Sequence, residues 1–173
     1  MKNPNLVIDI GQTFIKFVVI EKYKVIDHII LKNNLLVKKG ILIYNISKLK
    51  KIIFTNIKKI SKKYKIKKII PITHGSASFY INKDNEFFSG PHFLQRTGKS
   101  FDKEFFNIIK KKDYTHSIKL NCYHNLGKSF YYLIKNRKRL NILKIFTFPC
   151  LINFILTGKL YLDKSYLGCH SFS

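Results

Sequence analysis

The chain has 173 residues and a mass of 20.4 kDa, and 46% of its residues are hydrophobic. A chain of this length and composition can bury a core without disulfide bridges, which excludes an intrinsically disordered protein. Lysine and arginine number 33 against 9 aspartates and glutamates, a net charge of +24. This excess is mostly lysine and is spread along the whole chain, so we attribute it to drift toward AT-rich codons rather than to polyanion binding.

The sequence has no targeting or membrane-spanning signal. Asp9 and Lys16 interrupt the apolar runs near the N-terminus, which is not typical of a signal peptide. The longest later apolar stretch, residues 146–158, is too short to cross a bilayer. The three cysteines have no metal-binding spacing, which is typical of reduced thiols. We therefore expect a cytoplasmic protein without a membrane partner.

The first part of the chain predicts strands, then a helix, then another strand. Residues 5–10, 13–20 and 24–31 are rich in β-branched side chains, and a glycine turn joins the first two runs, which predicts an antiparallel meander. Apolar residues recur at helical spacing over 46–63, with lysines on the other face. Residues 67–72 predict a short buried strand.

The second part predicts mainly helices. Ser100 is the expected N-cap of one helix, and Gly158 is expected to end the last. This order of elements is that of the ribonuclease-H-like half of actin-type ATPases, so we expect an α/β fold with a mixed sheet and flanking helices. The expected elements are a hairpin of residues 77–81 and 86–88 and helices over 101–111, 125–138 and 148–156.

The turn after the first strand has the residues of a phosphate site. Gly11 lets the backbone turn sharply and approach an anion, and the N–H groups of Gln12 and Thr13 can donate to phosphate oxygens. Asp9 can hold Mg²⁺, and Lys16 adds a positive charge. The same short pattern also fits a plain hairpin in which Asp9 caps the turn.

A second polar cluster follows the strand at residues 67–72. Thr73, His74 and Gly75 stand at its carboxyl end, where open α/β sheets bind ligands. His74 can hydrogen-bond a sugar hydroxyl through either ring nitrogen. The alternative is a histidine that satisfies the backbone of its own loop.

The C-terminal segment contributes further short motifs. Asn-Leu-Gly-Lys occupies 125–128, and Phe-Pro-Cys-Leu occupies 148–151. Asp163 is expected to order a loop. Cys169 and His170 are adjacent, and neighbouring residues rarely ligate one ion, so we interpret them as scaffold.

Taken in order, these motifs resemble the N-terminal part of the FGGY family of carbohydrate kinases, above all its fuculokinase- and rhamnulokinase-like branch. The resemblance runs from Asn5 to Ser173, so residues 1–173 are expected to form the family's N-terminal domain without its second lobe. Phe14 departs from the pattern, because family members commonly carry a small residue there.

The resemblance implies ATP and Mg²⁺ as cofactors and a sugar or polyol as substrate. By position, Asp9 would hold the metal and Thr73, His74 and Gly75 would border the sugar. The residues that would contact the ATP phosphates are Gly11, Gln12, Thr13 and Lys16. The catalytic aspartate of the family matches no position in this sequence, so we expect an inactive portion that needs a complementing C-terminal chain.

Two other functions remain open on the same fold. One is a basic module that binds nucleic acid without catalysis, since a charge of +24 attracts phosphates at low salt. Nuclease chemistry needs several carboxylates that converge on two metals, and the nine acids give no convincing set. The other is a non-catalytic scaffold with an exposed apolar face.

Overall fold

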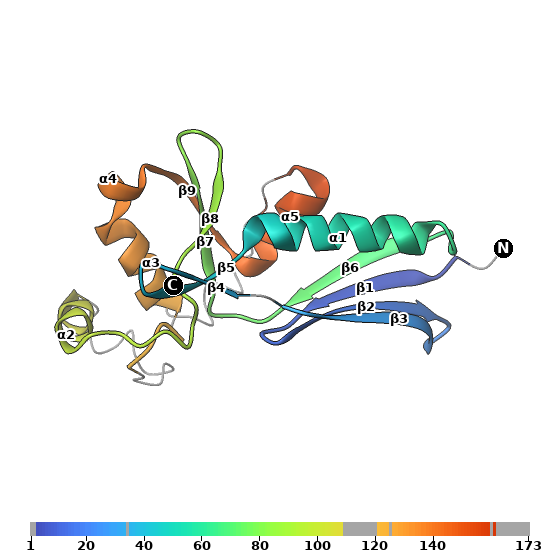
Figure 1. The fold of residues 1–173 in the computed structure, drawn as a ribbon, viewed down its shortest axis with the longest axis horizontal. Coiled ribbons are helices and arrows are strands. Elements are labelled where there is room, and N and C mark those ends of the chain that lie inside the picture. The colour runs from blue at the N-terminus through green and yellow to red at the C-terminus, as the bar shows by residue number, and fades with distance from the viewer. Residues whose placement is uncertain (1–2, 34, 109–120, 125, 160, 162–173) are drawn as a thin grey trace.

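The structure is a computed structural model that describes residues 3–33, 35–108, 121–124, 126–159 and 161. Its main sheet has four strands in the order β3-β2-β1-β6 (Figure 1). The first three strands are antiparallel, as the sequence predicted, and β6 is parallel to β1. The prediction that β6 is buried is wrong, because β6 lies at the edge of the sheet and Ile69, Ile70 and Ile72 are exposed. The strands are β1 (Asn5–Ile10), β2 (Phe14–Glu21), β3 (Lys24–Lys32) and β6 (Lys68–Thr73).

Helix α1 (Ile46–Ser61) covers one face of this sheet. Asn45 caps it, because its side-chain oxygen accepts a hydrogen bond from the Lys48 N–H at 3.0 Å. Side chains alternate between the two faces of a strand, so every second residue of β1 and β2 meets the helix. The fully buried residues of this core include Leu6, Ile8, Ile10, Ile15, Phe17 and Ile53.

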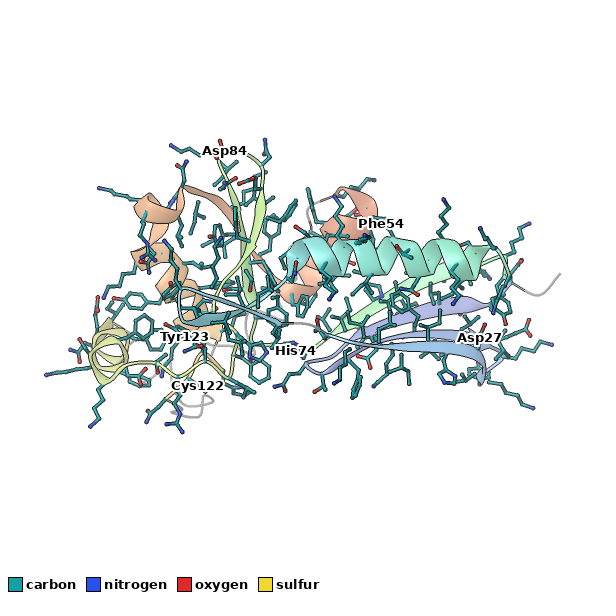
Figure 2. The ribbon with its side chains drawn as sticks, in the orientation of Figure 1. Asp27, Phe54, His74, Asp84, Cys122 and Tyr123 are labelled. Atoms are coloured by element: carbon teal, nitrogen blue, oxygen red, sulfur yellow. The ribbon has the colours of Figure 1, made fainter. Side chains whose placement is uncertain are left out.

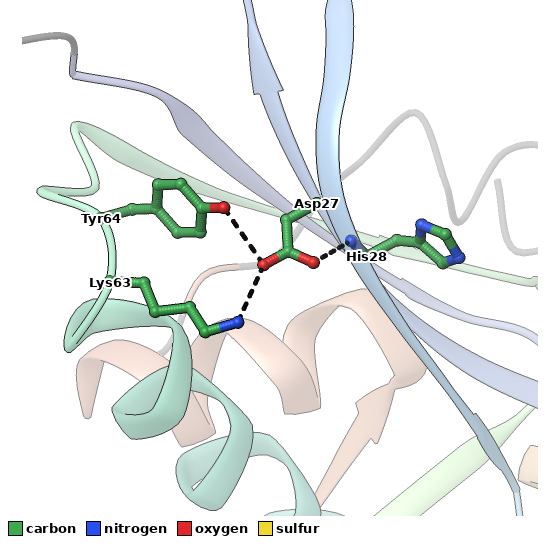
Figure 3. Close-up of polar contacts among 4 residues, drawn as sticks. All are labelled: Asp27, His28, Lys63 and Tyr64. Carbon is green, nitrogen blue, oxygen red and sulfur yellow. Dashed lines mark hydrogen bonds and ion pairs between the residues drawn. The ribbon is translucent and has the colours of Figure 1, made fainter.

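A polar contact joins the C-terminal end of α1 to strand β3 (Figure 3). The Asp27 carboxylate accepts hydrogen bonds from the Tyr64 hydroxyl at 3.2 Å, the Lys63 ammonium at 3.5 Å and the His28 N–H at 2.8 Å. Desolvation acts to raise the pKa of Asp27, but the Lys63 charge and these hydrogen bonds outweigh it and lower the pKa. The contact links the segment after α1 to β3 at the surface of the protein.

Two smaller sheets lie beyond the main one. A hairpin of β4 (Leu35–Lys38) and β5 (Ile41–Tyr44) follows β3, and β7 (Ser78–Asn82) pairs with both β8 (Phe87–Ser89) and β9 (Ile142–Thr147). The hairpin of β7 and β8 matches the prediction. Strands β4, β5 and β9 are not in the sequence prediction. Each has at most six residues, and β9 runs directly into the apolar helix that follows it.

The helices match the prediction with two corrections. Helix α2 begins at Lys99, so Ser100 lies inside it and is not its cap. The helix expected over 125–138 is interrupted at Asn136, between α3 and α4. Gly158 ends the last helix in the left-handed conformation, with φ of 69°, as expected. The helices are α2 (Lys99–Ile108), α3 (Leu126–Lys135), α4 (Arg137–Leu140) and α5 (Phe148–Thr157).

The second face of the main sheet is partly open, and it carries apolar side chains as well as charged ones. Ile30 is 53% exposed and Ile72 is 50% exposed, and no described element covers them (Figure 1). Strand β6 lies at the edge of the sheet, among the strands that the structure describes, and it carries Pro71, a residue that sheets admit at edges. An open edge beside exposed apolar side chains favours association with another chain or with a further segment.

Replacing Ile72 with lysine should reduce self-association of the chain, because it puts a further charge on the open face, at the edge strand β6. The free energy of unfolding should change by less than about 0.5 kcal/mol, since the side chain is half exposed. Analytical ultracentrifugation over a range of concentrations measures the first quantity, and urea denaturation measures the second. Leu94→Lys is the matched control, because Leu94 is 55% exposed but lies outside this face. Equal effects of both substitutions would contradict the prediction.

Candidate functional site

The parallel pairing of β1 and β6 brings the two predicted motifs to one edge of the sheet. Ile10 pairs with Thr73, so both strands end at the same level. The turn at residues 11–13 follows one strand, and His74 follows the other (Figure 2). Carboxyl ends of parallel strands are the usual place for ligands in open sheets.

The turn after β1 is closed by backbone contacts. The Gly11 N–H donates to the Phe14 carbonyl at 2.9 Å, and a Cβ at position 11 would lie 3.2 Å from that oxygen. Asn33 braces the turn from the end of β3: its side-chain amide donates to the Gly11 carbonyl and its N–H to the Thr13 carbonyl, both at 2.8 Å. The turn is therefore a fixed loop that requires a small residue at position 11.

The outer side of this turn carries hydrogen-bond donors. Within the described part of the chain, no hydrogen bond takes up the N–H groups of Gln12 and Thr13 or the Thr13 hydroxyl. Thr13 is exposed and Gln12 is half-buried. Successive N–H groups at a turn form a concave site for anions.

Asp9 and Lys16 face each other across β1 and β2, on the side of the sheet opposite α1. The Lys16 ammonium lies 3.0 Å from a carboxylate oxygen of Asp9, and both side chains are partly exposed. The lysine thus neutralises the predicted metal ligand. The described residues include no group of three or more His, Cys, Asp or Glu side chains that could hold a metal.

Both ring nitrogens of His74 have partners within the protein. Nδ1 lies 2.6 Å from the Gly75 carbonyl, and Nε2 lies 2.7 Å from the Tyr44 hydroxyl. Because a carbonyl only accepts, Nδ1 carries the hydrogen and Nε2 accepts from Tyr44. Burial lowers the pKa of His74, although the Gly75 carbonyl acts in the opposite direction, so the ring is held neutral.

An aromatic cluster surrounds His74 and includes a second histidine. The rings of Phe93 and Phe148 each lie 5.2 Å from the His74 ring, and His92 packs against Tyr44 at 5.0 Å. His92 is fully buried, and its Nδ1 accepts a hydrogen bond from a backbone N–H at 3.3 Å. Burial, assisted by the nearby His74, lowers the pKa of His92 to about 4.

Several buried polar atoms at this corner have no hydrogen-bond partner. They are His92 Nε2, Thr73 Oγ1 and Thr147 Oγ1, and Thr147 directly precedes Phe148 of the cluster. Buried polar groups are nearly always paired, so unpaired ones need an explanation. Two other unpaired buried atoms, Asn5 Oδ1 and Thr97 Oγ1, come from other parts of the chain.

The sequence prediction omitted three residues of this site: Asn33, Tyr44 and His92. The meander offered a signal for Asn33, because an antiparallel third strand ends opposite the turn. Tyr44 and His92 had no such signal, since they come from a hairpin and a loop that the sequence did not resolve. Asn125, Asp163, Cys169 and His170, which the sequence analysis interpreted, lie outside the described residues.

No family model matches the sequence, and no curated protein matches it. Solved structures do match. A carbohydrate kinase from Novosphingobium aromaticivorans has a TM-score of 0.86 at 18% identity, over 99% of this chain and 37% of its own. A xylulose kinase from Lactobacillus acidophilus has a TM-score of 0.80 at 17% identity, over 98% of this chain and 36% of its own. The glycerol kinase from Plasmodium falciparum has a TM-score of 0.68 at 13% identity, over 99% of this chain and 41% of its own.

The chain therefore has the α/β, ribonuclease-H-like fold of a sugar-kinase N-terminal domain, with a mixed sheet and flanking helices, as the sequence predicted. It spans about 37% of the length of the first of these kinases. None of the described helices is both long and apolar enough to cross a membrane.

The buried His92 should make the protein less stable in mild acid. The unfolded chain takes up a proton near pH 6.5, whereas the folded chain takes it up only near pH 4, so stability falls as the pH drops through this window. Between pH 7 and pH 5 the loss from this one group is about 2 kcal/mol. Urea denaturation at both pH values measures it.

In that experiment, His92→Asn should reduce the change in the free energy of unfolding between pH 7 and pH 5. Asparagine keeps an acceptor for the backbone N–H but does not titrate. His28→Asn is the control, since it removes an exposed histidine of β3. A pH dependence that survives His92→Asn unchanged would contradict the assignment.

Proposed function

We propose that this chain is the phosphate-binding portion of an ATP-dependent carbohydrate kinase of the FGGY family, which phosphorylates a hydroxyl of a sugar or polyol. The observation that carries the proposal is the meeting of the Gly11 turn and the His74 corner at one edge of a sheet with this fold. Phosphoryl transfer needs the phosphate of ATP and the acceptor hydroxyl to be held next to each other, because the reaction depends on in-line positioning.

The turn fits the phosphates of ATP. Gly11 lets the turn close on the Phe14 carbonyl, and the N–H groups of Gln12 and Thr13 and the Thr13 hydroxyl are available donors. Lys16 supplies a positive charge that it shares with Asp9. We assign Gly11, Gln12, Thr13 and Lys16 to the phosphates.

Asp9 is the residue that would hold Mg²⁺. One carboxylate oxygen contacts Lys16, and hard carboxylate oxygens suit this cation, which keeps most of its waters. When bound, Mg²⁺ offsets the charge that develops on the transferred phosphoryl group. Asp9 would hold the cation beside the turn, and Lys16 would add its own positive charge there.

The acceptor side is assigned to Thr73, His74 and Gly75. The Thr73 hydroxyl is buried and has no hydrogen-bond partner among the described residues, so contact with a substrate hydroxyl would require the loop after β6 to open. The His74 ring is held by Tyr44 and Gly75, so it gives this corner a fixed wall. Further chain, in this polypeptide or in a separate one, would cover the open face of the main sheet and supply the base and the adenine site.

Thr13→Val and Lys16→Gln should each weaken the binding of MgATP about tenfold, because each removes a group that contacts a charged phosphate. Isothermal titration calorimetry at about 150 mM salt measures the affinity, since exposed charges are then screened beyond about 8 Å. Lys24→Gln is the matched control, because Lys24 lies at the other end of β3. Equal weakening by Lys24→Gln would mean that binding reflects overall charge, and the assignment would be wrong.

The chain alone should not turn over ATP with any sugar. A coupled assay of ADP release with a panel of ketoses and polyols tests this expectation, because the resemblance places the base in the missing portion. Sugar-dependent ADP release by the purified chain would contradict the need for a complementing portion. Specific binding of a nucleic acid at physiological salt would favour the alternative of a basic binding module.

A further inference from the structure

A pocket of about 430 Å³ lies on the other side of β5 from the His74 corner. Its walls are the β4–β5 hairpin, strands β7 and β8, and helices α3 and α4, which gather at one end of the molecule (Figure 1). Ile43 lines the pocket, and its neighbour Tyr44 contacts His74. Adjacent residues of a strand point to opposite faces, so β5 separates the pocket from the proposed kinase site.

The rim of this pocket is positively charged. Lys38, Lys39 and Arg139 line it, and all three are exposed. No ion pair between described residues involves any of them, and none of the residues that line the pocket is acidic. The nearby acids Asp84 and Glu86 belong to the β7–β8 turn, where they accept hydrogen bonds from the Asn82 side chain.

The turn between β4 and β5 positions the backbone of Lys38 and Lys39 at the rim of the pocket. Lys39 and Gly40 connect β4 to β5, and both have positive φ, at 51° and 74°. This is the two-residue turn whose twist matches that of the strands. The hairpin is anchored to the loop that follows β8, because the His92 N–H donates to the Leu42 carbonyl at 2.8 Å. The lysines therefore have a defined position at the rim.

The interior of the pocket is aromatic. The rings of Tyr80 and Phe88 stack with centroids 5.2 Å apart and an angle of 20°, and Tyr132 also lines the cavity. Lys38 lies over the Phe88 ring at 5.6 Å, a cation–π distance. Burial and the neighbouring Tyr132 raise the pKa of Tyr80, and the positive charge of Arg139, which lines the same pocket, acts in the opposite direction.

We propose that this pocket binds a small aromatic monophosphate. Three cations, with no acidic residue among those that line the pocket, match a phosphate, which presents three oxygens, better than a single carboxylate. The volume is that of a small-molecule site and exceeds what a lone inorganic anion fills. The aromatic wall is suited to a ring that carries the phosphate. The site is independent of the proposed ATP turn.

Phenyl phosphate is the probe, because it contains a ring and a phosphate but no sugar or nucleoside. Calorimetric titration at about 150 mM salt should show saturable binding, with inorganic phosphate and phenol each at least tenfold weaker. Arg139→Gln and Lys39→Gln should each weaken the binding of phenyl phosphate about tenfold. Both residues are exposed, so the variants should fold, and circular dichroism checks this.

Lys50→Gln on α1 and Lys24→Gln at the start of β3 are the matched controls, because each removes the same charge outside the pocket. Both should bind phenyl phosphate as the parent chain does. Absence of saturable binding, or equal weakening by the controls, would overturn the proposal. So would an affinity for inorganic phosphate equal to that for phenyl phosphate.

Discussion

The parallel pairing of β1 with β6 is the constraint on which the rest of the site depends. It sets Ile10 beside Thr73, so the turn that follows one strand and the histidine that follows the other share an edge of the sheet. A parallel pair needs a long connection, and the chain from β2 to α1 provides it, with α1 packed over the buried face of β1. A shift of this pairing by one residue would turn the alternate side chains of β6 to the other face.

The corner beside His74 combines rigidity with unsatisfied polar groups. Tyr44 and Gly75 fix the imidazole, and the aromatic rings around it exclude water from the neighbouring His92. In a finished core, the hydroxyl of Thr73 and the Nε2 of His92 would have partners. The outer face of the main sheet is also partly open, and both features agree with the proposal that further chain packs here.

Charge acts locally in this protein in spite of the large overall excess of lysine. At the turn, Lys16 is paired with Asp9. At the pocket behind β5, three cations gather without acidic residues among the lining. Most other lysines lie on solvated surface, such as the outer face of α1, where salt screens them. Composition counts every lysine in the same way. Only the fold decides whether a lysine is in an ion pair, in a cluster of cations or on a solvated surface.

The sequence by itself determined the meander, helix α1, the parallel strand and the last helix with its glycine end, because those segments have strong periodicity or clear turn residues. It also identified the Gly11 turn and the His74 corner as polar clusters at strand ends. Only the tertiary structure decided that Asp9 is paired with Lys16, that Asn33 braces the turn, and that His92 is buried without a partner for Nε2. These contacts join residues of different elements, and local patterns carry no information on which side chains of distant segments meet.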